Sequence, residues 1–334
     1  MAKRQIIPIF IPHYGCIHDC VFCNQRSISG ASDPPTAQKV HQIVKSAILE
    51  GLSGINPSRP VELAFYGGSF TALPIPQQIE YLSSAQALIA QRPDNCIRIS
   101  TRPDCIDSKA VQMLIGYGVK IIELGAQSMC EDVLLKSNRG HSPSDVVTAS
   151  KIIKSSGLSL ILQMMTGLPG DSSEKSIYTA NELAKLEPSG VRIYPTAIVK
   201  GTELYRMWKR GEYKEHSVDE AVELCSVLYA IFELAGIPVI RLGLNPSDDL
   251  SREVAAGAYH PAFGELVYSR LYYNTASELL KNTAPGSDAV ILVPKGHLSQ
   301  MIGRKRENIT KLKAEYALNS LKVLESDCER AELF

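Results

Sequence analysis

The chain has 334 residues, 45% of them hydrophobic, which is enough for one large domain and a smaller one around a sizeable core. Its 35 basic and 35 acidic residues cancel, so the overall charge excludes a general attraction to nucleic acid or membrane and leaves only local patches. No apolar stretch approaches a membrane span, the N-terminal apolar run lacks a signal-peptide cleavage site, and the eight cysteines lack the spacing of a disulfide framework. We therefore expect a globular protein of the cytoplasm.

Short apolar runs typical of strands alternate along the chain with longer amphipathic runs typical of helices. The predicted strands are Gln5–Ile11, Val61–Tyr66, Cys96–Thr101, Val119–Leu124, Leu158–Gln163, Val191–Thr196 and Val239–Leu242. The predicted helices are Thr36–Leu52, Ile75–Gln91, Ser108–Tyr117, Ser142–Ser156, Ser173–Leu186 and Ser217–Leu234. This alternation predicts an α/β fold with a parallel sheet buried on both faces. Periodicity alone does not separate a doubly wound sheet from an incomplete TIM-like barrel.

Three cysteines, Cys16, Cys20 and Cys23, stand within eight residues directly after the first predicted strand. Three thiolates this close can hold three corners of a cubic iron–sulfur cluster and leave one iron open to a small molecule. The same spacing also fits one face of a helix with three buried thiols, or a zinc site completed by His13 or His18. An open iron would indicate chemistry, whereas the two alternatives indicate structure.

Polar motifs follow the ends of six predicted strands. They are the cysteine run, Gly67–Thr71, Thr101–Asp104, Gly125–Ser128, Gln163–Gly170 and the segment from Pro195 onward. Because the carboxyl ends of parallel strands meet at one edge of a sheet or barrel, we expect these motifs to converge. The sequence therefore predicts an active-site rim at that edge.

The Cys-x3-Cys-x2-Cys run, with Phe22 directly before its last cysteine, resembles the signature of the radical S-adenosylmethionine (SAM) enzymes. The resemblance implies an incomplete TIM-like (β/α)6 barrel in which SAM chelates the open iron of a [4Fe-4S] cluster. It also implies cleavage of SAM to a 5′-deoxyadenosyl radical by an electron from a donor such as flavodoxin or ferredoxin. The cofactors carry the difficult chemistry, and the protein positions them.

The resemblance also implies cofactor-binding positions along the rim. A Gly-Gly turn exposes backbone groups for the amino group of SAM, and an arginine offers a planar fork to its carboxylate. Neutral glutamines suit hydrogen bonds to ribose or carboxylate, and the rigid turn Gly167–Gly170 suits contact with adenine. The cofactor-binding candidates are Phe22, Gly67, Gly68, Ser69, Gln127, Arg139, Gln163 and Leu168.

Further blocks narrow the resemblance to the radical SAM domain of the Elongator catalytic subunit (Elp3) group, over roughly residues 5–240. They are Tyr66–Pro74, Glu123–Ser128, Asn138–His141, Gly167–Gly170 and Arg192–Tyr213, of which the coproporphyrinogen oxidases do not share the last. This resemblance implies modification of the wobble uridine of tRNA. The gap between the first two cysteines is shorter than in that group, and the 334 residues hold no counterpart of its acetyltransferase domain. We therefore do not extend acetyl transfer to this chain.

A small C-terminal α+β domain is expected at residues 245–334, after a barrel domain at residues 1–244. Pro246–Asp249 is typical of a linker, and a helix is predicted at Phe263–Leu280. Predicted elements at 290–293, 298–302, 307–316 and 321–324 give a strand–helix–turn–helix–strand order that resembles a KH-type RNA-binding module. Its turn Gly303–Arg306 has Arg306 in place of the second glycine, which either spoils the turn or adds a phosphate contact. The turn lies in a locally basic segment, for which a solvated helical face is the alternative. The RNA-binding candidates are Lys295, Arg304, Lys305 and Arg306.

Three functional hypotheses follow from these observations. The first is a radical SAM enzyme that modifies a tRNA base. The second is a radical SAM oxidoreductase of a small molecule, like the coproporphyrinogen oxidases, and the third is a non-catalytic iron–sulfur or zinc protein that binds RNA. No hydrogen donor is assigned, because Tyr194, Cys130 and Cys225 qualify by chemical type alone. Lys200 and Glu203 are expected near substrate from their rim position.

Overall fold

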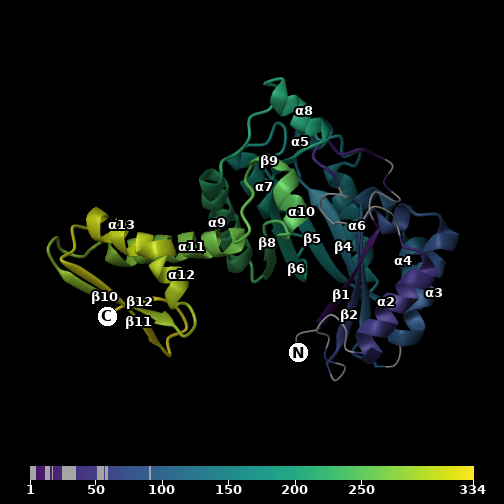
Figure 1. Cartoon of the computed structure of the whole chain (residues 1–334), viewed down its shortest axis with the longest axis horizontal. Helices are drawn as coiled ribbons and strands as arrows, with labels where there is room; N and C mark the ends of the chain where they lie inside the picture. The colour runs from purple at the N-terminus through teal and green to yellow at the C-terminus, as the bar shows by residue number, and fades with distance from the viewer. Residues whose placement is uncertain are drawn as a thin grey trace.

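The structure is a computed structural model that describes residues 5–11, 16, 18–24, 35–50, 56, 59–89 and 92–334, without the side chains of residues 44, 47–50 and 87–89. In this part of the chain the strands form one large parallel sheet and two small sheets. Figure 1 shows the large sheet running from β1 across to β8, and a C-terminal unit that projects beyond α9 along α11. None of the helices described here combines the length and apolar composition needed to cross a membrane.

The strands of the large sheet lie side by side in the order of the sequence. They are β1 (Gln5–Ile11), β2 (Val61–Gly67), β3 (Cys96–Thr101), β4 (Val119–Gln127), β5 (Ser159–Thr166), β6 (Gly190–Pro195) and β8 (Val239–Leu242), each paired in parallel with the next. A doubly wound sheet reverses its strand order at a switch point, and this order has no reversal. Right-handed crossovers then place the connecting helices on one face, so the sheet curls into a half-barrel. The incomplete TIM-like barrel is confirmed.

The predicted helices are present with small shifts at their ends. They are α2 (Ala37–Glu50), α3 (Ile75–Ile89), α4 (Ser108–Gly116), α6 (Pro143–Ser155), α7 (Ser173–Ala184) and α9 (Val218–Leu234). Side-chain oxygens of Asp107, Ser142, Ser172 and Ser217 accept backbone N–H groups and fix where α4, α6, α7 and α9 begin. The predicted ends at Leu52 and Gln91 lie outside the described residues. Two short helices at the rim of the sheet, α5 (Glu131–Lys136) and α8 (Glu203–Lys209), were not predicted.

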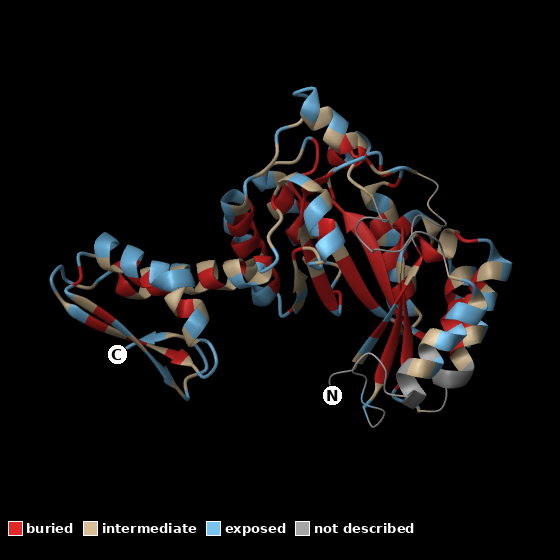
Figure 2. Ribbon diagram, viewed as in Figure 1, coloured by how far each residue is buried: buried red, intermediate tan, exposed pale blue. Residues whose placement is uncertain are grey.

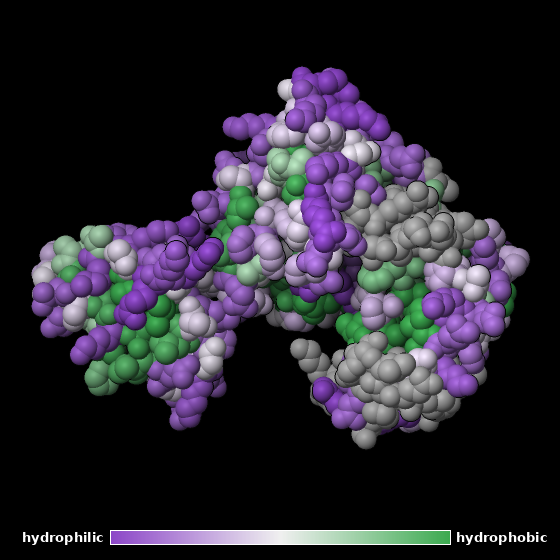
Figure 3. All heavy atoms as spheres, in the orientation of Figure 1, coloured by the Kyte–Doolittle hydropathy of each residue, from purple (hydrophilic) through white to green (hydrophobic). Residues whose placement is uncertain are grey.

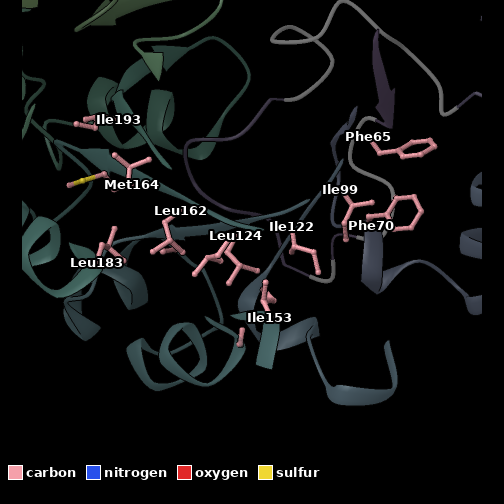
Figure 4. Close-up of a cluster of buried hydrophobic side chains, with 14 of the residues drawn as sticks. Phe65, Phe70, Ile99, Ile122, Leu124, Ile153, Leu162, Met164, Leu183 and Ile193 are labelled. Atoms are coloured by element: carbon pink, nitrogen blue, oxygen red, sulfur yellow. The ribbon is translucent and has the colours of Figure 1, made fainter. Parts of the chain in front are cut away.

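Alternation along the strands separates an apolar outer face from a polar inner face. In β2, Leu63 and Phe65 are buried in the main core, whereas Glu62 and Tyr66 alternate with them and lie on the inner face. Figure 2 shows the strands buried along most of their length, and Figure 4 shows outer-face side chains such as Leu124 gathered towards the covering helices. The concave inner face is therefore the side of the sheet on which polar chemistry can be built.

The C-terminal unit has its own core and the predicted order of elements. β10 (Asp288–Pro294) pairs in parallel with β11 (Ser320–Ser326) and antiparallel with β12 (Glu332–Leu333). Between the parallel strands the chain forms α12 (Leu298–Ile302) and α13 (Glu307–Glu315). Ile291, Met301 and Leu312 are fully buried in this core. α11 (Phe263–Leu280), predicted with these bounds, packs on α9 and joins the unit to the barrel.

The segment between β8 and α11 returns to the barrel. Ser247 caps the short helix α10 (Asp248–Glu253), where the sequence predicts a linker. The following strand β9 (Val254–Gly257) pairs with β7 (Ala197–Val199), which follows β6. The domain boundary between residues 244 and 245 stays a prediction.

We expect Leu124→Ala to lower the free energy of unfolding by about 2–5 kcal/mol, because deleting buried methyl groups leaves a cavity in a close-packed core. Leu124 is fully buried between the sheet and the helices. The measurement is chemical denaturation followed by circular dichroism, with Leu234→Ala, at an 89% exposed position, as the matched control. Equal destabilisation by the two variants would contradict this account of the core.

Candidate functional site

The cysteine loop is held at the carboxyl end of the sheet by the two unpredicted helices. The Val21 N–H donates to the Ser137 carbonyl just after α5 (3.2 Å), and the Leu204 N–H in α8 donates to the Val21 carbonyl (2.7 Å). Asn138 Nδ2 also donates to the Asp19 carbonyl (2.8 Å). These bonds fix the loop backbone against the rim, so α5 and α8 position the cysteines.

Phe22 anchors the same loop through apolar packing. Its ring packs against a small cluster of Val21, Ile198 and Leu204. α8 covers this cluster and carries mainly hydrophilic residues on the outer surface, as Figure 3 shows at the projecting end of the barrel. The structure thus gives Phe22 a packing role, and its contact with SAM stays a prediction.

One guanidinium group joins the cysteine loop to the sheet. Arg139 Nη1 donates to Cys20 Sγ (3.1 Å), and Nη2 donates to the Gly125 carbonyl in β4 (2.7 Å). A Cβ at Gly125 would lie 2.9 Å from Gln127 Nε2 and 3.2 Å from Arg139 Nη2, so this approach needs a glycine. The predicted ligand of the SAM carboxylate therefore lies beside a predicted cluster ligand.

Cys16 lies close to Cys20 and to the Gly-Gly turn. Burial raises the pKa of the Cys16 thiol; the Ser69 backbone N–H lowers it, and the nearby Cys20 sulfur raises it. The guanidinium groups of Arg139 and Arg102 lower that pKa as well. Cationic neighbours favour the thiolate, which is the form that binds metal. Burial is the largest of these effects, so the pKa of the Cys16 thiol is raised overall, and binding of a metal would have to displace its proton.

Within the described residues, no three His, Cys, Asp or Glu side chains converge closely enough to hold a single metal ion. His13, one of the two proposed zinc ligands, lies outside the described residues. The ring of His18, the other proposed ligand, fills the space where a Cβ at Gly140 would stand. A [4Fe-4S] cluster instead bonds each thiolate to a different iron. A three-thiol loop beside two guanidinium groups fits such a cluster in its donor chemistry.

The Gly-Gly turn brings the ends of β1 and β2 together. Gly67 has φ +104°, and a Cβ there would lie 3.0 Å from the Ile11 carbonyl oxygen. The Gly68 N–H donates to that same carbonyl (2.6 Å). Only glycine combines this backbone conformation with this close approach. The need to pack β2 against the end of β1 is therefore enough to explain a glycine at residue 67.

The Ser69 side chain is directed into the rim itself. Its Oγ lies 3.0 Å from Thr101 Oγ1 and accepts the Arg102 backbone N–H (3.1 Å). The hydroxyl thus ties the end of β2 to the end of β3, while the Ser69 backbone N–H contacts Cys16. Any contact of Ser69 with SAM would therefore come from its backbone.

Gln127 occupies a strained position at the end of β4. Its φ is +64°, in the left-handed region, where the β4–β5 register shifts between Gly125 and Gln127. Such a conformation costs about 1–2 kcal/mol in a residue other than glycine and is concentrated at functional sites. Its buried Oε1 has no hydrogen-bond partner among the described residues. An unpaired buried acceptor fits a ligand that carries hydroxyl groups, such as a ribose.

Gln163 is committed to a buried charge network that the sequence analysis did not predict. Its Nε2 donates to Glu123 Oε1, and the Glu123 carboxylate also meets Arg98 Nη1 (3.1 Å) and Arg192 Nε (3.3 Å). Arg98 Nη2 in turn lies 2.7 Å from Glu62 Oε1. Charged residues that alternate with apolar ones in β2, β3, β4 and β6 were the available sequence signal for this inner face.

The Gly167–Gly170 turn is held by hydrogen bonds on both sides of its first residue. Tyr213 Oη donates to the Gly167 carbonyl (2.5 Å), and the Gly167 N–H donates to Asp171 Oδ2 (2.8 Å). Leu168 is 2% exposed, and the turn borders a cavity of about 370 Å³ together with residues 212–214 and 216. The rigidity of the turn and the contact of Leu168 with adenine stay predictions.

The other sequence candidates lie at different places. Cys225 is fully buried in the core between sheet and helices, away from the inner face. Cys130 precedes α5, and its N–H donates to Ser128 Oγ (3.1 Å). Lys200 Nζ donates to the Arg252 carbonyl, whereas Glu203 is held in exposed ion pairs with Arg206 and Arg210. These contacts give each of the four a structural role.

The turn of the C-terminal unit forms although Arg306 stands where the KH-type motif has its second glycine. Gly303, Lys305 and Arg306 all have positive φ, at +74°, +50° and +63°. Asn308 lies beneath the turn, where its Nδ2 donates to the Met301 carbonyl (3.1 Å). The substitution therefore does not spoil the turn, and two residues other than glycine hold left-handed conformations in it.

The cations of this turn face solvent. Arg304, Lys305 and Arg306 are exposed, and in the described part of the chain no acidic side chain forms an ion pair with them. Lys295 differs, because its Nζ lies 2.7 Å from Asp327 Oδ1. The structure thus groups three of the four RNA-binding candidates and pairs the fourth with an acid.

Comparisons with known proteins agree with this geometry. The Radical SAM superfamily matches residues 10–183, and the Radical_SAM C-terminal domain matches residues 188–273. A tRNA uridine(34) acetyltransferase of Methanocaldococcus infernus is 32% identical over 78% of this chain and 54% of its own length. Elongator complex protein 3 of Bos taurus is 29% identical over 63% of this chain and 42% of its own length. The chain spans about half the length of these relatives.

A solved structure of the Methanocaldococcus infernus Elp3, lacking its residues 1–46, matches with a TM-score of 0.63 and 25% identity. The match covers 82% of this chain and 64% of that one. A curled parallel half-barrel with three cysteines after its first strand defines a radical SAM enzyme, and the chain belongs to the radical SAM superfamily. Its similarity to the Elp3 group, predicted from the motifs, is confirmed.

We expect Gly125→Ala to weaken SAM binding by at least about tenfold, because the new methyl group would displace the Arg139 and Gln127 side chains. Gly116→Ala is the matched control, since no heavy atom lies within 4 Å of its Cβ position. The measurement is calorimetric titration of SAM into reconstituted protein. Unchanged affinity in Gly125→Ala would show that Arg139 does not position SAM.

Proposed function

We propose that this chain is a radical SAM enzyme that modifies a base of tRNA, with Cys16, Cys20 and Cys23 holding a [4Fe-4S] cluster. The observation that carries the proposal is the bridge from Cys20 through Arg139 to Gly125. It places the cysteine loop against the end of β4, next to the glycine turn at the end of β2. Superfamily membership supports the same cofactors.

A cluster held by Cys16, Cys20 and Cys23, once reduced by a one-electron donor such as flavodoxin or ferredoxin, would supply the electron for cleavage of SAM to methionine and a 5′-deoxyadenosyl radical. The residues of the chain orient SAM and exclude water. The N–H groups of Arg139 that Cys20 and Gly125 do not use are donors for the SAM carboxylate, and backbone carbonyls at Gly67 and Gly68 accept hydrogen bonds from its amino group. The Gln127 oxygen accepts a ribose hydroxyl.

The RNA part of the proposal is supported by the C-terminal turn and by the similarity to a tRNA uridine(34) acetyltransferase and to Elongator complex protein 3. Arg304, Lys305 and Arg306 are exposed on one turn and form no ion pair with an acidic side chain that the structure describes, which suits contact with backbone phosphates. Lys295 contributes less, because Asp327 already pairs with it. The neutral composition of the chain makes this patch the place where a polyanion would bind.

Anaerobically reconstituted protein should form 5′-deoxyadenosine from SAM with dithionite, and Cys20→Ala should form almost none, because the variant removes one cluster ligand. Cys328→Ala, in the C-terminal unit and far from the loop along the chain, is the matched control. The measurement is chromatographic quantitation of deoxyadenosine, with iron and sulfide content determined in parallel. A natural chain with four irons that forms no deoxyadenosine would contradict the radical chemistry.

Changing Arg304, Lys305 and Arg306 together to alanine should weaken tRNA binding and flatten its dependence on salt. The slope of log K against log salt should fall by about 2–3, because each phosphate contact contributes about 0.7–0.9. Fluorescence anisotropy with a labelled tRNA transcript measures this, with Lys281→Ala as control because Lys281 lies outside the turn and pairs with Glu278. An unaltered slope in the triple variant would remove the turn from the RNA interface.

A further inference from the structure

One arginine spans the inside of the half-barrel. Arg192 in β6 donates from Nη1 to Tyr194 Oη (3.2 Å) in its own strand and from Nη2 to Tyr66 Oη (3.1 Å) in β2. β6 and β2 are separated in the sheet by β3, β4 and β5. The guanidinium therefore crosses the concave face and brings two phenols from opposite sides of it together.

A buried carboxylate fixes the position of the Arg192 guanidinium. Its Nε lies 3.3 Å from the fully buried Glu123 carboxylate, which Arg98 and Gln163 also hold. Glu62 pairs with Arg98 on the same face, and Arg241 in β8, in register with Arg192, is held by the Gly243 carbonyl (3.2 Å) and Asn245 Oδ1 (2.7 Å). The arginine that holds the two phenols is therefore itself paired with a buried carboxylate.

Each phenol keeps its own hydrogen for a ligand. Tyr66 Oη and Tyr194 Oη accept hydrogen bonds from Arg192, and among the described residues neither donates one. Burial raises the pKa of both phenols, so both stay protonated near neutral pH. Both side chains are only partly buried, on the inner face close to the strand ends. A pair of O–H donors requires acceptors, such as carbonyl oxygens, in whatever binds there.

A flat apolar surface adjoins the donors. Phe10 in β1 is in register with Tyr66, and the two ring centroids are 6.1 Å apart. Phe10 is also partly exposed on this face. Aromatic side chains beside hydrogen-bonding groups are the combination with which proteins receive an unstacked base.

We propose that Phe10, Tyr66 and Tyr194 form the floor on which the target base is read, and that this floor selects a pyrimidine with two ring carbonyls. The inference rests on the proposed function and adds base selection to it. Uracil offers carbonyl acceptors at both positions flanking its ring N–H, whereas cytosine replaces one with an amino donor.

The test uses two anticodon stem–loop RNAs that differ only by uridine or cytidine at position 34. Deoxyadenosine formation with dithionite is measured for the full chain with each RNA and without RNA. The parent should be stimulated more by the uridine RNA. Tyr66→Phe and Tyr194→Phe should each lose about fivefold to tenfold of that stimulation and most of the preference for uridine, because each removes one hydroxyl donor.

Two controls separate base reading from folding and from SAM binding. Tyr178→Phe removes a hydroxyl at a 51% exposed position on α7 and should behave as the parent. RNA-free deoxyadenosine formation and iron content should be unchanged in both floor variants. Loss of the RNA-free reaction in these variants would overturn the inference, because the phenols would then serve SAM or the fold.

The remaining outcomes are distinguishable. If the floor variants keep the stimulation and the uridine preference of the parent, the inference is overturned while the proposed function stands. If neither RNA stimulates a parent that forms deoxyadenosine, both the RNA function and the inference are overturned. Stimulation without any preference between the two RNAs in the parent also overturns the inference, since the floor would then not read the base.

Discussion

The buried carboxylate of Glu123 is the interaction on which the inner face of the half-barrel depends. It has no exposed surface and lies between Arg98 and Arg192. A buried charge costs several kcal/mol unless it is paired, and removing one partner of a buried pair typically costs about 3–5 kcal/mol. The network therefore fixes β2, β3, β4 and β6 relative to one another across the concave side, while apolar packing fixes them on the outer side.

Arg139 connects separate segments at the rim, as Glu123 does on the inner face. Through one guanidinium it connects the cysteine loop to β4, and it occupies space that only a glycine at residue 125 leaves open. The site is thus assembled from segments that cannot fold independently of the sheet. Because β4 also carries Glu123, a shift of this strand would disturb the rim and the inner face together.

Much of the fold was accessible from sequence, because alternating apolar runs and cap residues act locally. Gln5–Ile11, Cys96–Thr101 and Phe263–Leu280 were predicted with the bounds that the structure has. The choice of a barrel was not accessible from periodicity, since strand order is set by long-range pairing. The hydrogen-bond partners of Gln163 and Ser69, which are Glu123 and Thr101, could not be predicted from the sequence either. These contacts depend on how strongly the sheet curls and on how far each strand extends towards the rim. Arg192 was visible only as part of a motif, since its reach to Tyr66 crosses three strands.

The two ends of the molecule differ in their electrostatics, and under the proposed function this difference would divide the recognition of an RNA between them. The turn at residues 304–306 holds three cations without an ion-pair partner among the described residues, two of them at positive φ, a conformation that costs about 1–2 kcal/mol in a residue other than glycine. Phosphate contacts of this kind position a nucleic acid without reading its sequence. On the inner face the two carboxylates are paired with arginines, and the hydroxyl donors proposed to distinguish bases would supply little long-range attraction. The affinity for RNA would therefore depend on the turn at residues 304–306, and the choice of base would depend on Phe10, Tyr66 and Tyr194. Because these are separate residues, each property can change without altering the other.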